Sequence, residues 1–228
     1  MGKIGLSNNQ LKIIAMVSMT LDHIGVALFP QNMLLRILGR LAFPIYAFMI
    51  AEGCGHTRKP WRYFASMAGL ALVCQIVYFV VMGSLYQCIL VTFSMSIGLI
   101  LLGRRAVQKG GFFNWLLLLL SMAAVLFVCQ VLPNLLSETD YQVDYGFIGV
   151  MMPVLVYFAR GKWGKLVTAA CVLALLALDS VTVQWYALAA LPLLALYNGQ
   201  RGKWKMKWAF YLYYPAHLVA IQVIAWLL

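Results

Sequence analysis

The sequence has 228 residues, of which 64% are apolar and only 10% are charged, with a mean hydropathy of +0.89 and a formal net charge of +11. Soluble domains carry about 45–50% apolar and about 25% charged residues, and disordered chains are more polar still, so this composition excludes both classes. Lipid leaves only helices and closed barrels as spanning structures, and continuous apolar runs such as 112–132 lack the alternation of barrel strands. We therefore predict an all-α, polytopic transmembrane helical bundle.

Nine apolar segments follow one another along the chain. They cover residues 10–29, 33–53, 62–82, 87–103, 112–132, 145–159, 164–179, 183–198 and 208–228. Several are shorter than the ~20 residues that a perpendicular span needs. Pro153 and Pro192 interrupt two of the weakest, so we expect kinked or broken spans there. Since no repeat or polar linker divides the sequence, residues 1–228 are predicted to form a single domain.

Basic residues fall in every second connection between these segments. They are Lys3 and Lys12; Arg58, Lys59 and Arg62; Arg104, Arg105 and Lys109; Arg160, Lys162 and Lys165; and Arg201, Lys203, Lys205 and Lys207. The other connections contain no Lys or Arg. Because cytoplasmic loops are enriched in these residues, the pattern predicts nine spans with the N-terminus in the cytoplasm. It also accounts for the positive charge without nucleic-acid binding.

Apart from residues at the segment ends, such as Lys12 and Glu52, five ionisable residues lie inside the predicted spans, where Arg, Lys or Asp each costs about 2.5–3.5 kcal/mol on insertion scales. They are Asp22 and His23 in the first segment, Arg36 and Arg40 in the second, and His217 in the ninth. A helix rises about 1.5 Å per residue, which places His23 and Arg40 roughly 10 Å below the outer surface. Charged groups inside a membrane mark functional sites, so these residues are candidates to line one cavity.

Helix periodicity indicates which of these side chains share a face. Lys12 and His23 are eleven residues apart and therefore lie on one face, roughly 16 Å apart along the axis. Asp22 points about 100° away from its neighbour and is not expected to orient His23. Arg36 and Arg40 share a face and repel each other, so an anion should compensate them. Asp22, another carboxylate such as Asp144, or a bound ligand could do so.

The His23 side chain has two interpretations at this point. It is either a structural histidine that hydrogen-bonds within the bundle or a general base. The five cysteines form no C-x-x-C pair and are odd in number, so we expect free thiols and no metal site, with a Cys88–Cys129 disulfide near the outer face as the alternative.

Four ordered blocks of the sequence resemble the TraX family, and the resemblance runs nearly from end to end. The first block is Leu11-Lys12-x-Ile14-Ala15-Met16 followed by Asp22-His23-Ile24-Gly25. The second is Arg36-x-x-Gly39-Arg40-Leu41-Ala42-Phe43-Pro44-Ile45-Tyr46-Ala47-Phe48, then Glu52-Gly53 and His56-Thr57. The third is Asp144-Tyr145-Gly146-x-x-Gly149-Val150. The fourth is Leu196-Tyr197-Asn198-Gly199-x-Arg201-Gly202, leading to Phe210-Tyr211-x-x-Tyr214-Pro215-x-His217-Leu218.

TraX proteins are integral membrane proteins known from conjugative plasmids, and the type member is implicated in N-terminal acetylation of pilin. The family is similar to membrane acyltransferases whose first span carries a basic residue, ten others and then a histidine. Lys12 and His23 have this spacing, with Lys where Arg is more usual. The resemblance implies a multi-pass protein of the bacterial cytoplasmic membrane that uses cytosolic acetyl-CoA as donor substrate, with His23 as the catalytic base.

The remaining candidates take roles within that expectation. We predict that Lys12 and Arg36 bind acetyl-CoA, that Arg40 stabilises the oxyanion, and that His217 positions the acceptor or shares the proton transfer. Asp22, Asp144 and Tyr214 are predicted to bind the acceptor, which offers an amine or a hydroxyl group and is a protein, a glycan or a small amine.

Two other functions stay open. Buried charges and broken helices also occur in transporters and channels, although the sequence shows no inverted repeat and is short for a carrier. The chain could also serve a conjugation apparatus as a membrane subunit without chemistry.

Overall fold

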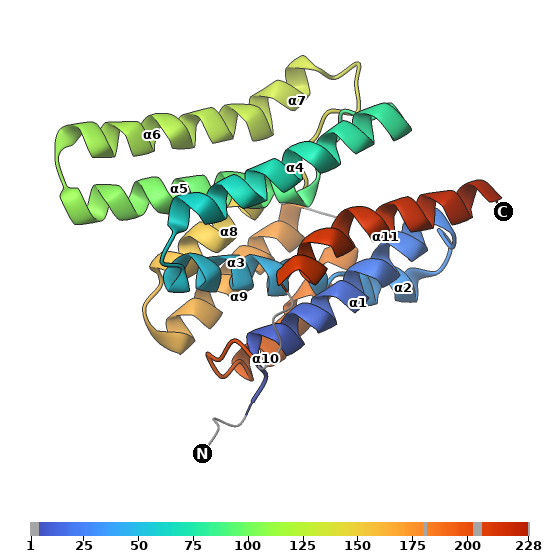
Figure 1. The fold of residues 1–228 in the computed structure, drawn as a ribbon, viewed down its shortest axis with the longest axis horizontal. Helices are drawn as coiled ribbons and strands as arrows, with labels where there is room; N and C mark the ends of the chain where they lie inside the picture. The colour runs from blue at the N-terminus through green and yellow to red at the C-terminus, as the bar shows by residue number, and fades with distance from the viewer. Residues whose placement is uncertain (1–4, 180–181, 203–206, 228) are drawn as a thin grey trace. The chain divides into compact units, whose positions relative to one another are not determined.

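A computed structural model describes residues 5–179, 182–202 and 207–227 of the chain, so Lys3, Lys203 and Lys205 of the basic connections lie outside the described residues. Over these ranges the chain is mostly helical and forms no β-strand, only isolated bridges that pair Leu6 with Tyr197 and Gln87 with Val143 (Figure 1). The prediction of an all-α protein is confirmed.

Each of the nine predicted apolar segments coincides with a helix or with a run of consecutive helices. The elements are α1 (Asn8–Ala27), α2 (Met33–Gly39), α3 (Ala42–His56), α4 (Pro60–Met82), α5 (Ile89–Lys109), α6 (Phe112–Leu126), the π-helical η1 (Phe127–Val131), α7 (Leu132–Leu135), α8 (Gly146–Phe158), α9 (Gly161–Asp179), the 3₁₀-helical η2 (Thr182–Ala189), α10 (Ala190–Ala195) and α11 (Lys207–Leu227).

Within the described ranges, five helical stretches are long and apolar enough to cross a membrane: Met33–His56, Pro60–Met82, Ile89–Lys109, Phe112–Leu135 and Gly161–Asp179. Shorter apolar helices cover Gly146–Phe158, Val183–Ala195 and Leu212–Leu227. The chain is thus a multi-pass helical protein, and the count of nine spans stays a prediction. The second segment is interrupted after Gly39, where we predicted one continuous span over 33–53, whereas Pro153 lies inside α8 without ending it.

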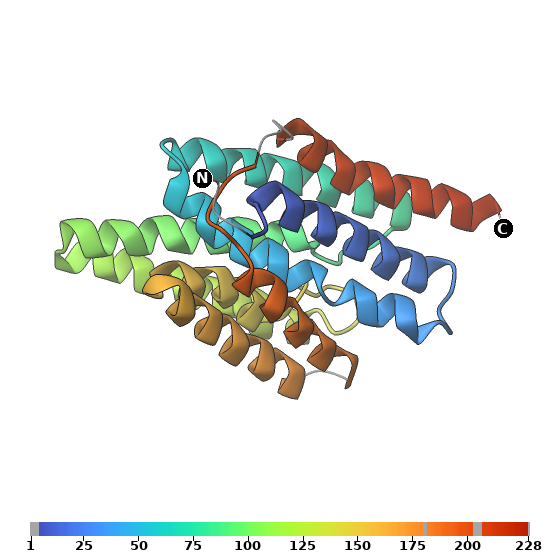
Figure 2. The same ribbon diagram turned by 90° about the horizontal axis from the view of Figure 1, so that it is seen from below.

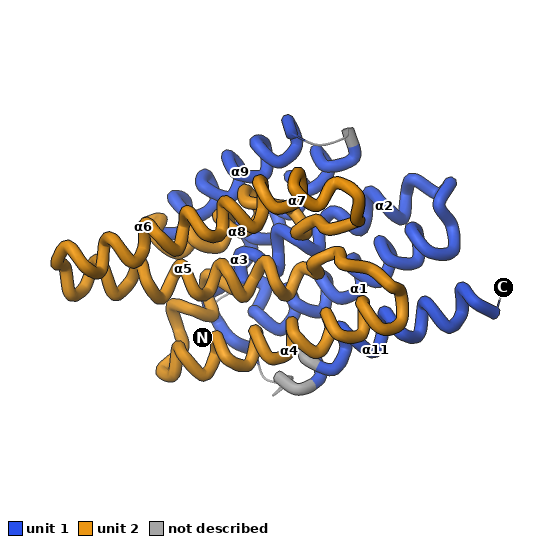
Figure 3. Tube along the Cα trace, turned by 90° about the horizontal axis from the view of Figure 1, so that it is seen from above, with its two compact units in different colours: residues 1–49, 160–228 blue, residues 50–159 orange. Residues whose placement is uncertain are grey.

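The chain divides into two compact units, residues 1–49 with 160–228 and residues 50–159 (Figure 3). In the second unit α5 packs against α4, α6 and α8, and its side chains Ile97 and Ile100 are fully buried. The helices α4 and α6 expose large apolar side chains such as Val80 and Phe112. Apolar faces of this kind are expected where helices contact lipid.

In the first unit α1 packs against α2 and α11, while α9 packs against η2 and α10. The helices α1 and α11 lie side by side and run in the same direction (Figures 1 and 2). From start to end, their contacts pair Lys12 with Phe210, Thr20 with Tyr213, and His23 with His217. A parallel pair is what the predicted topology requires, because its first and ninth spans both leave the cytoplasm.

The start of α1 is held by the loop that carries the fourth sequence block. Backbone N–H groups of Asn8 and Asn9 donate to the carbonyls of Gln200 and Arg201 at 2.8 and 3.2 Å. These groups would otherwise be unpaired at a helix start. The loop therefore fixes the residue at which α1 begins, and with it the position of His23 along the helix axis.

Candidate functional site

The core of the candidate site is a direct contact between His23 of α1 and His217 of α11. The His23 Nδ1 and His217 Nε2 atoms are 2.9 Å apart, and the ring centroids are 5.0 Å apart. The buried His217 ring is stacked on Tyr213 with an interplanar angle of 8° and meets the edge of Tyr214. Contacts with both tyrosine rings fix the orientation of His217, and through it that of His23.

The hydrogen bonds assign the protons on the two neutral rings. The other nitrogen of His217, Nδ1, lies 2.9 Å from the Tyr213 carbonyl, which can only accept, so Nδ1 carries the proton. In a neutral ring Nε2 of His217 is then an acceptor, and Nδ1 of His23 must donate to it. His23 Nε2 consequently keeps its lone pair, and this nitrogen is the one that can take up a proton.

Beside the histidine pair, Asp22 joins the two arginines of α2 and its C-cap. Asp22 Oδ1 lies 3.0 Å from Arg36 Nη1 and 2.6 Å from Arg40 Nη2. The expected compensating anion is therefore Asp22, and the cluster keeps one net positive charge. The charges of Asp22, Arg36 and Arg40 lie near enough to His23 to act on its ring.

The local sequence allows α1 and α2 to approach this closely. A Cβ atom on Gly39 would lie 2.4 Å from the Asp22 Cβ, and one on Gly25 would lie 2.9 Å from the Leu35 Cβ. The Ser18 hydroxyl donates to the carbonyls of Leu38 and Gly39 at 2.5 and 3.1 Å. The two glycines let α1 and α2 approach closely, and the Ser18 hydroxyl binds the end of α2. Together these contacts place both arginines against Asp22.

Arg40 has a further partner that sequence reasoning did not select. Its Nη1 donates to Gln184 Oε1 of η2 at 3.4 Å, and its Nε donates to the Arg36 carbonyl at 3.3 Å. Gln184 is 6% exposed. A single glutamine in a short apolar segment carries no recognisable signal, and only the packing of η2 against α2 shows its place.

The remaining predicted residues make other contacts. Lys12 Nζ sits 5.3 Å from the centre of the Phe210 ring, three helical turns before His23. Asp144 belongs to the second unit, where its carboxylate accepts from the Tyr86 hydroxyl at 2.8 Å and its carbonyl accepts from Thr92 at 2.7 Å. Burial and the Asp144 carboxylate raise the pKa of Tyr86. The substrate-binding roles of Asp22, Asp144 and Tyr214 stay predictions.

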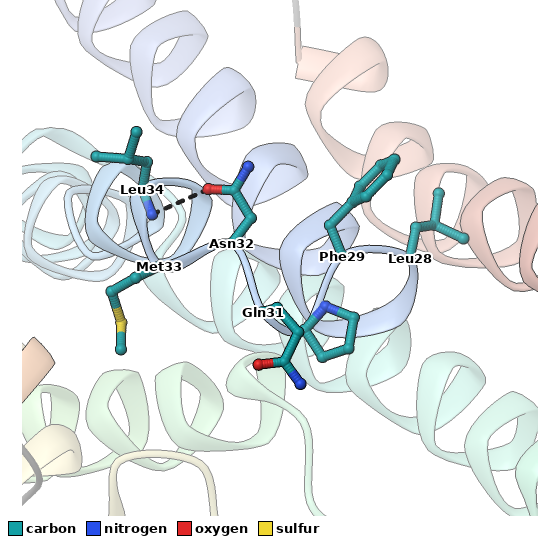
Figure 4. Close-up of a pocket in the computed structure, with 7 residues that line it drawn as sticks. Leu28, Phe29, Gln31, Asn32, Met33 and Leu34 are labelled. Atoms are coloured by element: carbon teal, nitrogen blue, oxygen red, sulfur yellow. Dashed lines mark hydrogen bonds between the residues drawn. The ribbon is translucent and has the colours of Figure 1, made fainter.

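An open pocket lies at the connection between α1 and α2, lined by residues 28–34 (Figure 4). The side-chain Oδ1 of Asn32 accepts from the Leu34 N–H at 3.2 Å within it. It contains none of the predicted site residues, and we assign it no role. Over the described ranges, no three His, Cys, Asp or Glu side chains gather as metal ligands would, and all five cysteines are free thiols.

Comparison with known proteins assigns the chain to a protein family. Over 38 residues it is 47% identical to the uncharacterized protein RP591 of Rickettsia prowazekii, a match that covers 17% of this chain and 15% of that protein. Over 79 residues it is 32% identical to a probable fimbrial assembly protein, FimC of serogroup H1, of Dichelobacter nodosus, covering 33% of this chain and 32% of that protein. No solved structure matches. The family described as TraX protein matches residues 7–225, and the chain therefore belongs to the TraX family.

Proposed function

We propose that this protein is an integral membrane acetyltransferase that moves the acetyl group of acetyl-CoA to an amine, with His23 as the general base. The observation that carries the proposal is the His23–His217 hydrogen bond. It fixes one tautomer and leaves the lone pair of His23 Nε2 available, which is what a general base requires. Membership of the TraX family supports the acetyl donor and the pilin N-terminus as acceptor.

The transfer proceeds in two steps, and the proton that His23 takes up in the first step is released in the second. His23 Nε2 removes a proton from the acceptor amine as its nitrogen attacks the thioester carbonyl carbon, and the carbonyl electron pair moves to oxygen. The oxyanion then collapses, the C–S bond breaks, and the leaving CoA sulfur receives the proton from the His23 imidazolium. The products are the acetylated amine and CoA, and His23 returns to its neutral form.

The arginine cluster provides the electrostatic part of this chemistry. Its net positive charge favours the oxyanion over the neutral thioester, and preorganised charges of this kind contribute strongly in a site shielded from water. The Arg36 side chain is 32% exposed and that of Arg40 is 13% exposed. Arg36, with the guanidinium's five N–H donors, is therefore the better placed of the two to meet a ligand.

The acceptor and the location belong to the same proposal. A fimbrial assembly protein among the relatives supports a pilus or fimbrial subunit as acceptor. We place the protein in the bacterial cytoplasmic membrane, where Lys12 and the basic connections face cytosolic acetyl-CoA and attract its phosphates.

The proposal is tested by measuring release of the CoA thiol from acetyl-CoA by the purified protein in lipid nanodiscs with an N-terminal pilin peptide. The wild type releases thiol only when the peptide is present. His23→Ala lowers the rate about 10²–10⁴-fold, the usual contribution of a general base. His56→Ala, which changes the one histidine outside the site, serves as the matched control. Equal rates in wild type and His23→Ala would refute the assignment of His23.

The interruption between α2 and α3, with two arginines beside it, is the observation that favours a transporter instead. Thermal-shift measurements separate the two functions. Stabilisation by CoA and acetyl-CoA supports the transferase, whereas stabilisation by ions or small solutes alone supports transport.

A further inference from the structure

Gln184 is a buried side chain with an unused hydrogen-bond donor. It is 6% exposed, and its Nε2 has no hydrogen-bond partner, one of two such buried side-chain atoms among the described residues. A buried amide N–H without a partner is costly, so native proteins rarely keep one without a reason. An unfilled donor beside a cluster of functional charges points to a ligand atom that completes it.

The orientation of this amide is set by chemistry. The Arg40 guanidinium carries only donors, so the amide oxygen of Gln184 must face it, as the 3.4 Å contact with Nη1 shows. The Nε2 group therefore points away from Arg40. Arg40 is itself tied to Asp22 and to the Arg36 carbonyl, which makes it a rigid support for the amide.

We infer that Gln184 Nε2 donates a hydrogen bond to the carbonyl oxygen of the acyl group during transfer. The inference rests on the proposed function and adds a residue to it. When the amine nitrogen forms its bond to the thioester carbon, the carbonyl π electrons move to oxygen, and the Gln184 N–H stabilises that charge. When the C–S bond breaks, the carbonyl re-forms and the hydrogen bond weakens. Side-chain amides serve as oxyanion donors in other acyl transfers.

Two substitutions of Gln184 distinguish its two possible roles, which are donating a hydrogen bond to the ligand and accepting one from Arg40. Gln184→Glu keeps an oxygen acceptor for Arg40 and removes the N–H donor, while Gln184→Met removes both at similar size. Both lower kcat about 10²-fold or more, the usual effect of losing an oxyanion donor, and change the KM for acetyl-CoA little. If Gln184→Met loses activity but Gln184→Glu retains it, Gln184 only holds Arg40 and the inference is wrong. Full activity in both variants overturns it as well.

A matched control is Gln75, whose amide groups are satisfied. Its Nε2 donates to the Tyr86 carbonyl at 2.8 Å and its Oε1 accepts from the Cys88 N–H at 3.3 Å. Gln75→Met should lower Tm while the folded protein keeps its kcat, whereas Gln184→Met should lower kcat.

Isotope-edited infrared spectroscopy of bound acetyl-CoA gives a readout that does not depend on turnover. The thioester carbonyl stretch should lie at lower frequency in the wild type than in Gln184→Met, and equal frequencies would overturn the inference. If wild type binds no acetyl-CoA, the proposed function fails, and the inference fails with it. If wild type transfers acetyl but the Gln184 variants match it, only the inference fails.

Discussion

Single hydrogen bonds decide the chemistry of the histidine pair. The Tyr213 carbonyl selects the proton on His217, and His217 in turn selects the proton on His23. His217 is therefore a positioning residue for His23 in this account. The pairing could not be read from the sequence, because 194 residues separate the two histidines. Sequence periodicity did place Lys12 and His23 on one face and did require an anion for the two arginines.

The first prediction concerns the His217 side chain. His217→Gln keeps an oxygen that can accept from His23 Nδ1, whereas His217→Leu does not, so Leu should lower kcat more than Gln. In His23→Ala the two His217 substitutions should have little further effect, because residues that act as a unit are not additive. Steady-state rates of the double variants check this, and independent, multiplying effects would contradict it.

The second prediction concerns Asp22. Asp22→Ala leaves two guanidiniums without their anion, which costs about 3–5 kcal/mol in a fully buried pair. Because the Asp22 side chain is 18% exposed and that of Arg36 is 32% exposed, we expect about 1–3 kcal/mol here. Thermal unfolding measures the loss. Adding Arg36→Ala should recover part of it, and a loss that simply sums the two single changes would argue against the cluster.

At the scale of elements, the interruption of the second apolar segment positions the arginines. Hydropathy alone predicted that each apolar segment is helical, because long apolar runs have few alternatives in lipid. It could not predict the end of α2 at Gly39, since residues 33–53 read as one continuous segment. That end depends on tertiary contacts, the Ser18 hydroxyl and the close approach of Asp22.

The third prediction tests this packing. Gly39→Ala places a Cβ 2.4 Å from the Asp22 Cβ and should destabilise the protein by about 1–3 kcal/mol, as overpacking does. Gly69→Ala is the control, because a Cβ there meets nothing within 4 Å and alanine is the better helix former. Tm should fall in the first variant and stay level or rise in the second. A Gly39→Ala protein as stable as wild type would show that α1 and α2 are not packed this closely.

The fourth prediction concerns the loops of the second unit. The Asp140 carboxylate accepts from the Ser84 hydroxyl at 2.5 Å and the Leu85 N–H at 2.9 Å, and these bonds hold the pKa of Asp140 below its ordinary value. A lowered pKa in the folded state gives stability that is present above the ordinary value of about 3.9 and is lost as the pH falls through the folded value.

Asp140→Asn should therefore be less stable than wild type at neutral pH and lose less stability on acidification. Unfolding measured between pH 7 and pH 3 checks the prediction. Glu138→Gln makes the same change of charge in the same connection and serves as control. Parallel pH profiles for wild type and Asp140→Asn would contradict it.

The alternating basic connections and the parallel direction of α1 and α11 favour the same orientation, in which both helices begin at the cytoplasmic side of the membrane. The fifth prediction tests it with single cysteines in a cysteine-free background, labelled by a membrane-impermeant maleimide in intact cells. Ser137→Cys should react from outside, and Lys109→Cys should react only after the membrane is permeabilised. Labelling of both residues from outside would overturn the predicted orientation.

In the proposed function, His23 drives acetyl transfer from acetyl-CoA to an amine. Its most direct test incubates the purified protein with isotope-labelled acetyl-CoA and an N-terminal pilin peptide, and locates the label by mass spectrometry. We predict a labelled acetyl group on the peptide α-amine with wild type and His56→Ala, and a rate at least about 10² lower with His23→Ala. An unlabelled peptide, or equal labelling by His23→Ala, would contradict the account.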